Sequence, residues 1–301
     1  MDQNKEDKTT KIISTRDLLE KMKISKNIIG DKERNFLLEK GYLILNPPEF
    51  IKKNLKKLNE VIKNLIKKEG NDGGWEGKEQ YYKKDKPFES GATRLGNLIE
   101  KDSLFKKIIT IPEILLLAHE VIKDDFKISG LNFRNPKKNM GEQSYHIDIL
   151  PRLKESDKYT GIVCAIFLDD SKIENGATRL IPGTHKILGW PDEHIDTKKL
   201  HKKEIRATLR AGSILIFNLN LWHAGAKNIS GEDRKVIFLQ IKNRKEPQLL
   251  NYKKYLSKKT KKELNQFEKY LLAVREEDPD QSEDSYSVGK HYREKFNQDR
   301  A

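Results

Sequence analysis

The chain has 301 residues, of which 36% are apolar and 35% charged, with a formal net charge of +14. This length can bury a sizeable core in one domain with appendages. No apolar run approaches the roughly 18 residues that span a bilayer, and the charged N-terminus lacks the apolar segment of a secretory signal. The lysines are spread along the chain, which favours a solvated basic surface over a nucleic-acid-binding one.

The single cysteine, Cys164, excludes an intramolecular disulfide. It lies in the apolar run 161–168, where a small buried hydrophobic residue is favoured over a nucleophile. Together with the absence of a signal, this composition predicts a cytoplasmic protein, in a reducing setting that keeps iron ferrous.

The first third of the chain is predicted to be largely helical, after an N-terminal extension at residues 1–30. Apolar residues at helical spacing within 49–69 leave lysines on the outer face. Gly41 follows a helical segment and Pro112 opens another, as is common at helix ends and starts. The predicted helices are 15–20, 31–40, 49–69 and 112–122, with a short strand at 42–45.

Residues 70–95 are predicted to form a lid. Glycines and aromatics such as Trp75, Tyr81 and Tyr82 occur there with little periodicity. A long irregular segment inside a domain is usually functional or disordered, and the aromatics favour a partly ordered lid that lines a substrate site.

From residue 126 the sequence becomes strand-like, with turn signals between the runs. Successive strands without long intervening helices predict a mainly β fold with flanking helices, either a sandwich or a double-sheet jelly roll. The predicted strands are 126–134, 143–150, 160–168, 177–181, 205–209, 213–222 and 234–241. We expect one domain over 31–250 with its β core at about 126–245, and a charged, helical C-terminal extension over 251–301.

His146 and Asp148 are two residues apart in the run 143–150. Side chains alternate across a strand, so an imidazole and a carboxylate would share one face. His223 closes the longest strand-like run and is a candidate third ligand. Two histidines and one carboxylate on one face define the site of non-haem Fe(II) oxygenases.

Arg234 follows His223 by eleven residues, at the start of an apolar strand where it shares a face with Val236, Phe238 and Gln240. An arginine in a pocket wall suits bidentate capture of a carboxylate. The three candidate ligands and Arg234 together fit an iron site that chelates 2-oxoglutarate and binds its far carboxylate.

These residues carry a resemblance to the phytanoyl-CoA dioxygenase (PhyH) family of Fe(II)/2-oxoglutarate-dependent oxygenases. The matching motifs are Gln-Ser-Tyr-His-Ile-Asp at 143–148, Glu-Asn-Gly-Ala-Thr-Arg-Leu-Ile-Pro-Gly-Thr-His-Lys at 174–186, and Leu-Trp-His-Ala-Gly at 221–225 with Arg234. The resemblance covers roughly residues 30–250.

The resemblance implies a double-stranded β-helix (jelly-roll, cupin-like) core in which His146, Asp148 and His223 bind iron. It also implies that Arg234 binds the distal carboxylate of 2-oxoglutarate. Fe(II), 2-oxoglutarate and O2 are the implied cofactor and co-substrates, and ascorbate is a candidate accessory.

The chain departs from the family at Gly225, where many members carry a serine or threonine that assists the same carboxylate. Further candidate co-substrate contacts are Arg94, Asn132, Gln143 and Thr178, whereas His185 in the Pro-Gly-Thr-His turn is expected to be structural.

The expected activity is hydroxylation of a small-molecule substrate, with an anionic one as a candidate, coupled to decarboxylation of 2-oxoglutarate to succinate and CO2. The family's halogenating members have a small residue at the position of Asp148, so this carboxylate favours hydroxylation. Two alternatives stay open: a cupin-type metal-dependent hydrolase or isomerase without 2-oxoglutarate, and a non-catalytic basic binding module.

Overall fold

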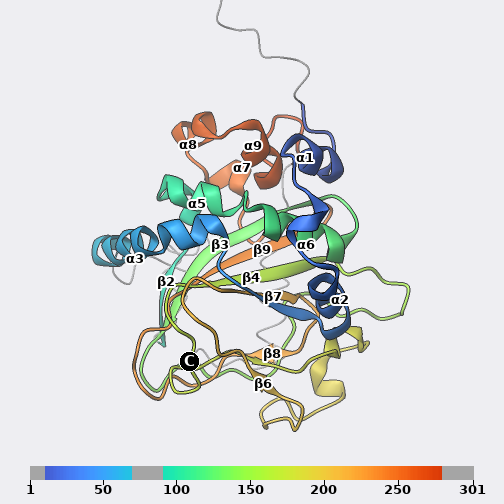
Figure 1. Cartoon of the computed structure of the whole chain (residues 1–301), viewed down its shortest axis with the longest axis vertical. Coiled ribbons are helices and arrows are strands. Elements are labelled where there is room, and N and C mark those ends of the chain that lie inside the picture. The colour runs from blue at the N-terminus through green and yellow to red at the C-terminus, as the bar shows by residue number, and fades with distance from the viewer. Residues whose placement is uncertain (1–10, 70–90, 280–301) are drawn as a thin grey trace, which may run out of the picture.

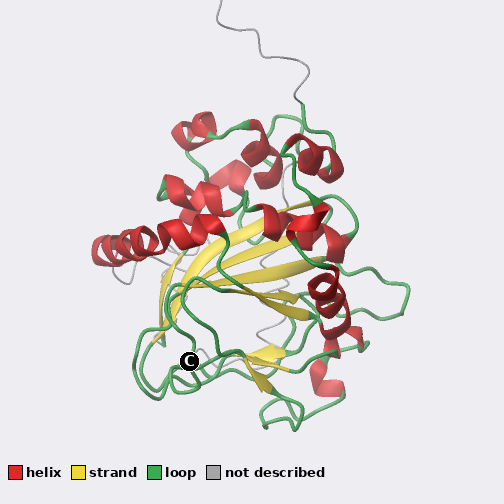
Figure 2. Cartoon of the chain, viewed as in Figure 1, coloured by secondary structure: helices red, strands yellow, loops and turns green. Residues whose placement is uncertain are grey.

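The computed structural model describes residues 11–69 and 91–279, whose strands form two antiparallel sheets with helices over the larger one (Figures 1 and 2). The larger sheet has the strand order β1-β7-β4-β9-β3-β2 and the smaller one β6-β5-β8. This arrangement confirms the predicted class. The strands are β1 (Tyr42–Leu45), β2 (Ala92–Leu95), β3 (Phe126–Pro136), β4 (Gly161–Phe167), β5 (Arg179–Leu180), β6 (Ile205–Arg206), β7 (Ile214–Asn218), β8 (His223–Ala224) and β9 (Val236–Asn243).

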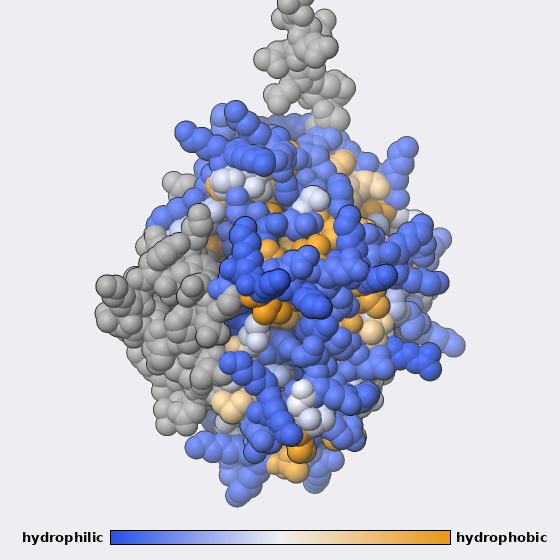
Figure 3. Space-filling model, turned by 90° about the vertical axis from the view of Figure 1, so that its left-hand side faces the viewer, coloured by the Kyte–Doolittle hydropathy of each residue, from blue (hydrophilic) through white to orange (hydrophobic). Residues whose placement is uncertain are grey.

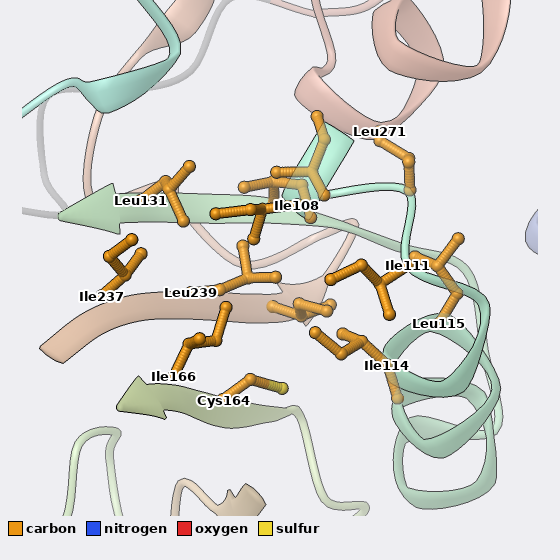
Figure 4. Packing of buried hydrophobic residues seen from close by; sticks show 14 of the residues in the cluster. Ile108, Ile111, Ile114, Leu115, Leu131, Cys164, Ile166, Ile237, Leu239 and Leu271 are labelled. Atoms are coloured by element: carbon orange, nitrogen blue, oxygen red, sulfur yellow. The ribbon is translucent and has the colours of Figure 1, made fainter. Parts of the chain in front are cut away.

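The helices gather on one face of the large sheet and bury its apolar side chains. Cys164 and Ile166 of β4 and Leu239 of β9 lie in one apolar cluster with Ile108, Ile114 and Leu115 from the helices that cover the sheet (Figure 4). The helices are α1 (Thr15–Lys21), α2 (Asp31–Lys40), α3 (Glu49–Glu69), α5 (Ser103–Ile108), α6 (Pro112–Ile122), α7 (Tyr252–Tyr255), α8 (Lys258–Glu263) and α9 (Gln266–Leu272), with single 3-10 turns at η2 (Lys26–Ile28), η4 (Leu98–Glu100), η5 (Thr184–Lys186) and η6 (Pro191–Glu193).

The opposite face of the large sheet, which faces the small sheet, carries a second apolar cluster. Val163 and Phe167 of β4 and Phe217 of β7 belong to it. Because successive side chains of a strand point to opposite faces, β4 feeds both clusters, and all seven of its residues are buried. This explains why its sequence is a continuous apolar run instead of an alternating one.

The N-terminal elements form at or very near the predicted bounds. α2 ends at Gly41, whose φ of +81° is the left-handed cap conformation and whose N–H donates to Leu37 O at 2.8 Å. A Cβ at Gly41 would also lie 2.4 Å from Nδ1 of His185. The turn into β1 therefore requires glycine for two reasons, its positive φ and the lack of space for a side chain. The short helix α5 was not predicted.

Near the candidate ligands, one predicted strand is wrong and another is shorter than predicted. Residues 143–150 form no strand, because their backbone pairs with separate segments: Tyr145 N–H with Thr197 O at 2.9 Å and Asp148 N–H with Leu219 O at 2.8 Å. The predicted strand 213–222 stops at Asn218, whose side chain accepts from Asn220 N–H at 2.9 Å and so starts a turn.

The other strand predictions need smaller corrections. Residues 92–95, predicted as the end of the lid, form β2 and pair with β3 at the edge of the large sheet. Strands predicted at 177–181 and 205–209 shorten to the two-residue strands β5 and β6. Most of the predicted lid, including Trp75, Tyr81 and Tyr82, lies outside the described residues.

The described parts of both terminal regions pack onto the helical side of the sheet. The backbone N–H of Thr15 in α1 donates to Asp125 Oδ1 at 2.6 Å, and its hydroxyl lies 3.3 Å from that of Tyr270 in α9. The amide of Gln248 donates to the carbonyls of Ile128 in β3 and Leu272 in α9.

Hydrophilic side chains cover most of the face in Figure 3, in keeping with the charged composition. Within residues 11–69 and 91–279, no helix is both long enough and apolar enough to cross a membrane. The longest, α3, buries Ile51, Leu58 and Ile62 and carries many lysines.

Candidate metal centre and co-substrate pocket

His146, Asp148 and His223 meet although they come from distant parts of the chain. Their ligand atoms all lie within 4.8 Å of one another. Asp148 Oδ1 is 3.8 Å from Nε2 of His146, and Oδ2 is 3.5 Å from Nε2 of His223. Both imidazoles are buried, and the carboxylate is partly exposed. Two imidazole nitrogens and one carboxylate converging from one side are the donor set of a facial triad with open positions.

The histidine tautomers suit metal binding. Nδ1 of His146 lies 2.9 Å from Ser144 O, and Nδ1 of His223 lies 2.9 Å from Leu221 O. A carbonyl only accepts, so each Nδ1 carries the proton and donates, leaving the Nε2 lone pair turned toward Asp148. Burial, with the neighbouring His223, lowers the pKa of His146 to about 4. A neutral ring with a free Nε2 is the form that ligates a metal, so these residues fit a divalent ion.

The backbone holds the two histidine segments side by side. His146 N–H donates to His223 O at 2.9 Å and His223 N–H donates to His146 O at 3.0 Å. On its other side, His223 pairs with Leu180 of β5. The ring of His223 lies 4.6 Å from that of Phe217 on the inner face of the large sheet. The triad therefore sits between the two sheets.

The packing around Gly225 explains why this chain has no serine or threonine at that position. Its N–H donates to Gln143 Oε1 at 3.0 Å, and its carbonyl accepts from Gln143 N–H at 3.1 Å. A Cβ at Gly225 would lie 2.4 Å from Gly141 O and 2.8 Å from Gln143 Oε1. The packing therefore leaves no space for a serine or threonine, and Gln143 acts here as a support for the His223 segment.

Arg234 is buried, with 3% of its surface exposed. It precedes β9, and Asn135 Oδ1 accepts from its backbone N–H at 2.9 Å. Its Nε is buried without an acceptor, and no carboxylate of the described residues pairs with its guanidinium. Burial, and secondarily Arg134, lowers its pKa to about 9. A buried cation without a counter-ion is costly, so the pocket fits an anionic ligand.

The remaining predicted co-substrate contacts differ in position. Asn132 lies opposite Phe238 in the sheet, and Arg94 lies opposite Arg134, which in turn lies opposite Val236. Directly paired residues share a face, and Val236 and Phe238 belong to the inner cluster, so Asn132 and Arg94 face the same side as the triad. Thr178 is buried just before β5, and its carbonyl accepts from Ala207 N–H.

His185 is buried away from the triad, with Nε2 3.1 Å from Leu38 O. It does not belong to the group of ligand atoms around Asp148. It joins the Pro-Gly-Thr-His turn to α2, as expected of a structural residue.

A buried polar network adjoins the triad through Tyr145, the residue before His146, and the sequence did not predict it. The hydroxyl of Tyr145, next to His146, donates to Glu204 Oε2. Arg206 Nε lies 2.6 Å from Glu204 Oε1, and Arg179 Nη1 lies 3.7 Å from Glu204 Oε2. Arg179 also donates to Gln143 O and covers the ring of Tyr145. Glu204 follows a loop excursion, so no local pattern indicates this role.

Arg134 and Gln240 were also missed as site residues. Arg134 has the same parity as Asn132 on β3, and this could have been read from the sequence. Gln240 is 8% exposed, and its buried Oε1 has no donor among the described residues. Its row of the inner face contains Val163 and Phe217, the latter against His223.

A sequence model of the phytanoyl-CoA dioxygenase family matches residues 39–236, and the chain belongs to this family. It is 28% identical over 159 residues to an uncharacterized protein, Rv1501, of Mycobacterium tuberculosis, covering 50% of this chain and 54% of that protein. It is 27% identical over 184 residues to an ectoine dioxygenase of Stutzerimonas stutzeri, covering 50% of this chain and 58% of that enzyme. The chain thus spans little more than half the length of these relatives.

Solved structures confirm the jelly-roll fold. The structure of HygX from Streptomyces hygroscopicus, with nickel and 2-oxoglutarate bound, superposes with a TM-score of 0.56 at 14% sequence identity, covering 71% of this chain and 87% of HygX. At this identity the likeness concerns the fold, the double-stranded β-helix of Fe(II)/2-oxoglutarate oxygenases.

Proposed function

We propose that this protein is an Fe(II)- and 2-oxoglutarate-dependent dioxygenase that hydroxylates a small-molecule substrate and converts 2-oxoglutarate to succinate and CO2. The observation that carries the proposal is a two-histidine, one-carboxylate cluster on the same side of the sheet as a buried arginine that has no carboxylate partner among the described residues. Membership of the phytanoyl-CoA dioxygenase family supports it.

His146, Asp148 and His223 would hold the iron through two Nε2 atoms and one carboxylate oxygen. The bound iron would supply the oxidising chemistry, with 2-oxoglutarate as the electron donor to oxygen. The protein's task is to fix the ligands and exclude water. The Nδ1 bonds to Ser144 O and Leu221 O keep both rings in the ligating orientation.

Arg234 would bind the distal carboxylate of 2-oxoglutarate. A buried guanidinium presents a planar fork that matches a carboxylate, and the bond is charge-assisted on both sides. Arg94, Asn132, Gln143 and Thr178 remain proposed contacts of the same pocket. For Gln143 the side-chain oxygen is already used by Gly225 N–H, which leaves its amide nitrogen for such a contact.

Asp148 favours hydroxylation as the outcome. Its carboxylate lies within 4 Å of both imidazole nitrogens and would therefore fill the third ligand position. Family members that halogenate have a small residue there, which leaves that position to a halide.

The main rival is a metal-dependent hydrolase or isomerase that uses the triad without 2-oxoglutarate. Arg234 argues against it, because such chemistry gives no reason to bury a guanidinium that finds no carboxylate within residues 11–69 and 91–279. A purely basic binding module gives no reason to converge three ligand groups in the interior.

Anaerobic titration with Fe(II) and 2-oxoglutarate tests the proposal. A metal-to-ligand charge-transfer band in the visible region should appear when both are bound. Asp148→Ala should abolish the band, and Arg234→Ala or Arg234→Lys should shift its 2-oxoglutarate dependence to higher concentration. Arg210→Ala, at an exposed arginine, is the matched control. A wild-type protein that forms neither the band nor succinate would rule the proposal out.

A further inference from the structure

Two arginines lie on the inner face of the large sheet, and a third comes just before β9. Arg94 of β2 lies directly opposite Arg134 of β3, and Arg134 lies directly opposite Val236 of β9. Arg234 precedes Val236 by two residues, and its backbone is tied to Asn135, the neighbour of Arg134. Arg134 and Arg234 are therefore diagonal neighbours.

Diagonal neighbours on one face have Cα atoms about 7–8 Å apart, within reach of long side chains. Burial and, next, the charge of Arg134 lower the pKa of Arg234, in keeping with the close approach of the two guanidinium groups that the register gives. Like charges on adjacent strands destabilise a sheet. An anion held between them would offset that repulsion.

The anion needs more donors than Arg234 can offer. A carboxylate has two oxygens and about four lone-pair sites, of which one bidentate guanidinium fills two. Gly225 has no hydroxyl, and the backbone of Gly141 leaves no space for one. The additional donor must therefore come from another side of the pocket, and β3 forms the adjacent wall.

We propose that Arg134 is a second guanidinium for the distal carboxylate of 2-oxoglutarate, acting with Arg234 in place of the hydroxyl that position 225 cannot carry. The inference rests on the proposed function. It makes Arg134 a specificity-determining residue: it favours 2-oxo acids with a second carboxylate and has no role at the chelating end. Its interactions with other residues of the chain are compatible with this role, because a guanidinium has five N–H donors.

Affinities for two ligands test the inference. In anaerobic titrations of the Fe(II)-loaded protein, Kd is measured for 2-oxoglutarate and for 2-oxobutyrate, which chelates identically but lacks the distal carboxylate. Arg134→Gln should raise the Kd for 2-oxoglutarate roughly ten- to a hundredfold, as loss of a charge-assisted hydrogen bond does. The Kd for 2-oxobutyrate should stay unchanged.

Arg134→Lys keeps the charge but not the fork, so it should give a smaller increase in the Kd for 2-oxoglutarate. It also serves if Arg134→Gln does not fold, and Arg210→Gln is the control for a lost surface charge. Equal weakening of both ligands, or of neither, would overturn the inference while leaving the oxygenase assignment intact. Failure of the wild-type protein to bind either ligand would instead count against the proposed function.

Discussion

His146 and His223 are hydrogen-bonded to each other through their backbones in both directions, at 2.9 and 3.0 Å. They are 77 residues apart in sequence (223 − 146), yet this isolated bridge sets the separation of their imidazoles, whose centroids lie 4.2 Å apart. The bridge is short, so its geometry depends on the segments beside it. Gln143 and Gly225 extend it by two further backbone and side-chain bonds.

Gly225→Ala is therefore expected to destabilise the protein and weaken metal binding. The new Cβ would lie 2.4 Å from Gly141 O and 2.8 Å from Gln143 Oε1, so the backbone beside His223 must shift. Overpacking of this kind costs about 1–3 kcal/mol. Urea unfolding measures the loss.

Gly30→Ala is the matched control, because a Cβ there would meet its nearest atom, Glu33 Oε2, at 3.4 Å and the residue is exposed. A Gly225→Ala protein as stable as the Gly30→Ala protein would contradict the crowding argument.

Glu204→Gln should disturb the triad indirectly, through the network that holds Tyr145 next to His146. Glu204 is the shared partner of Tyr145, Arg179 and Arg206, and its side chain is only 9% exposed. Removing its charge takes away the carboxylate that pairs with buried Arg179, and breaking a buried ion pair typically costs about 3–5 kcal/mol. Because Tyr145 adjoins His146, the affinity for Fe(II) should fall as well.

Tyr145→Phe removes one hydrogen bond and keeps the ion pairs, so its cost should be smaller, about 0.5–1.5 kcal/mol. Urea unfolding and Fe(II) titration of both variants separate the two effects. If Glu204→Gln proves no more harmful than Tyr145→Phe, the ion pairs contribute little to the network.

The candidate ligands could be picked out from the sequence, whereas the residues that support them could not. His146, Asp148, His223 and Arg234 stand out because metal and carboxylate binding require those residue types, and the structure places the first three together. The alternating pattern at 143–150 was misleading, because an irregular segment can bury the same apolar residues as a strand.

Tyr145 and Glu204 are 59 residues apart and joined by no periodicity, so only the folded chain reveals their contact. Arg134 was different. Its parity with Asn132 along β3 placed it on the site-facing side, and the sequence contained that information.

The stability of the metal-free protein should fall as the pH decreases from about 6.5 to 4. His185 is buried, and burial lowers its pKa to about 4 from the usual 6.5. Between these values the unfolded chain binds a proton that the folded protein does not, so stability rises with pH. Each such histidine contributes a slope of up to about 1.4 kcal/mol per pH unit.

His185→Gln should flatten this dependence, because glutamine does not titrate. Urea midpoints between pH 4 and 7 for both proteins provide the comparison. His201→Gln, at a more accessible histidine in a loop, should leave the slope close to that of the wild type. A slope for His185→Gln identical to that of the wild type would mean that other groups dominate the acid sensitivity.

Divalent metal should stabilise the protein through the triad alone. A ligand that binds only the folded state adds RT ln(1 + [L]/Kd), about 2.7 kcal/mol at a concentration a hundred times Kd. Anaerobic melting with and without Fe(II) should therefore give a clear rise in melting temperature. Asp148→Ala removes the carboxylate between the two Nε2 atoms and should abolish the rise. Asp192→Ala, at an exposed carboxylate, should retain it, and a rise that persists in the Asp148 variant would place the metal elsewhere.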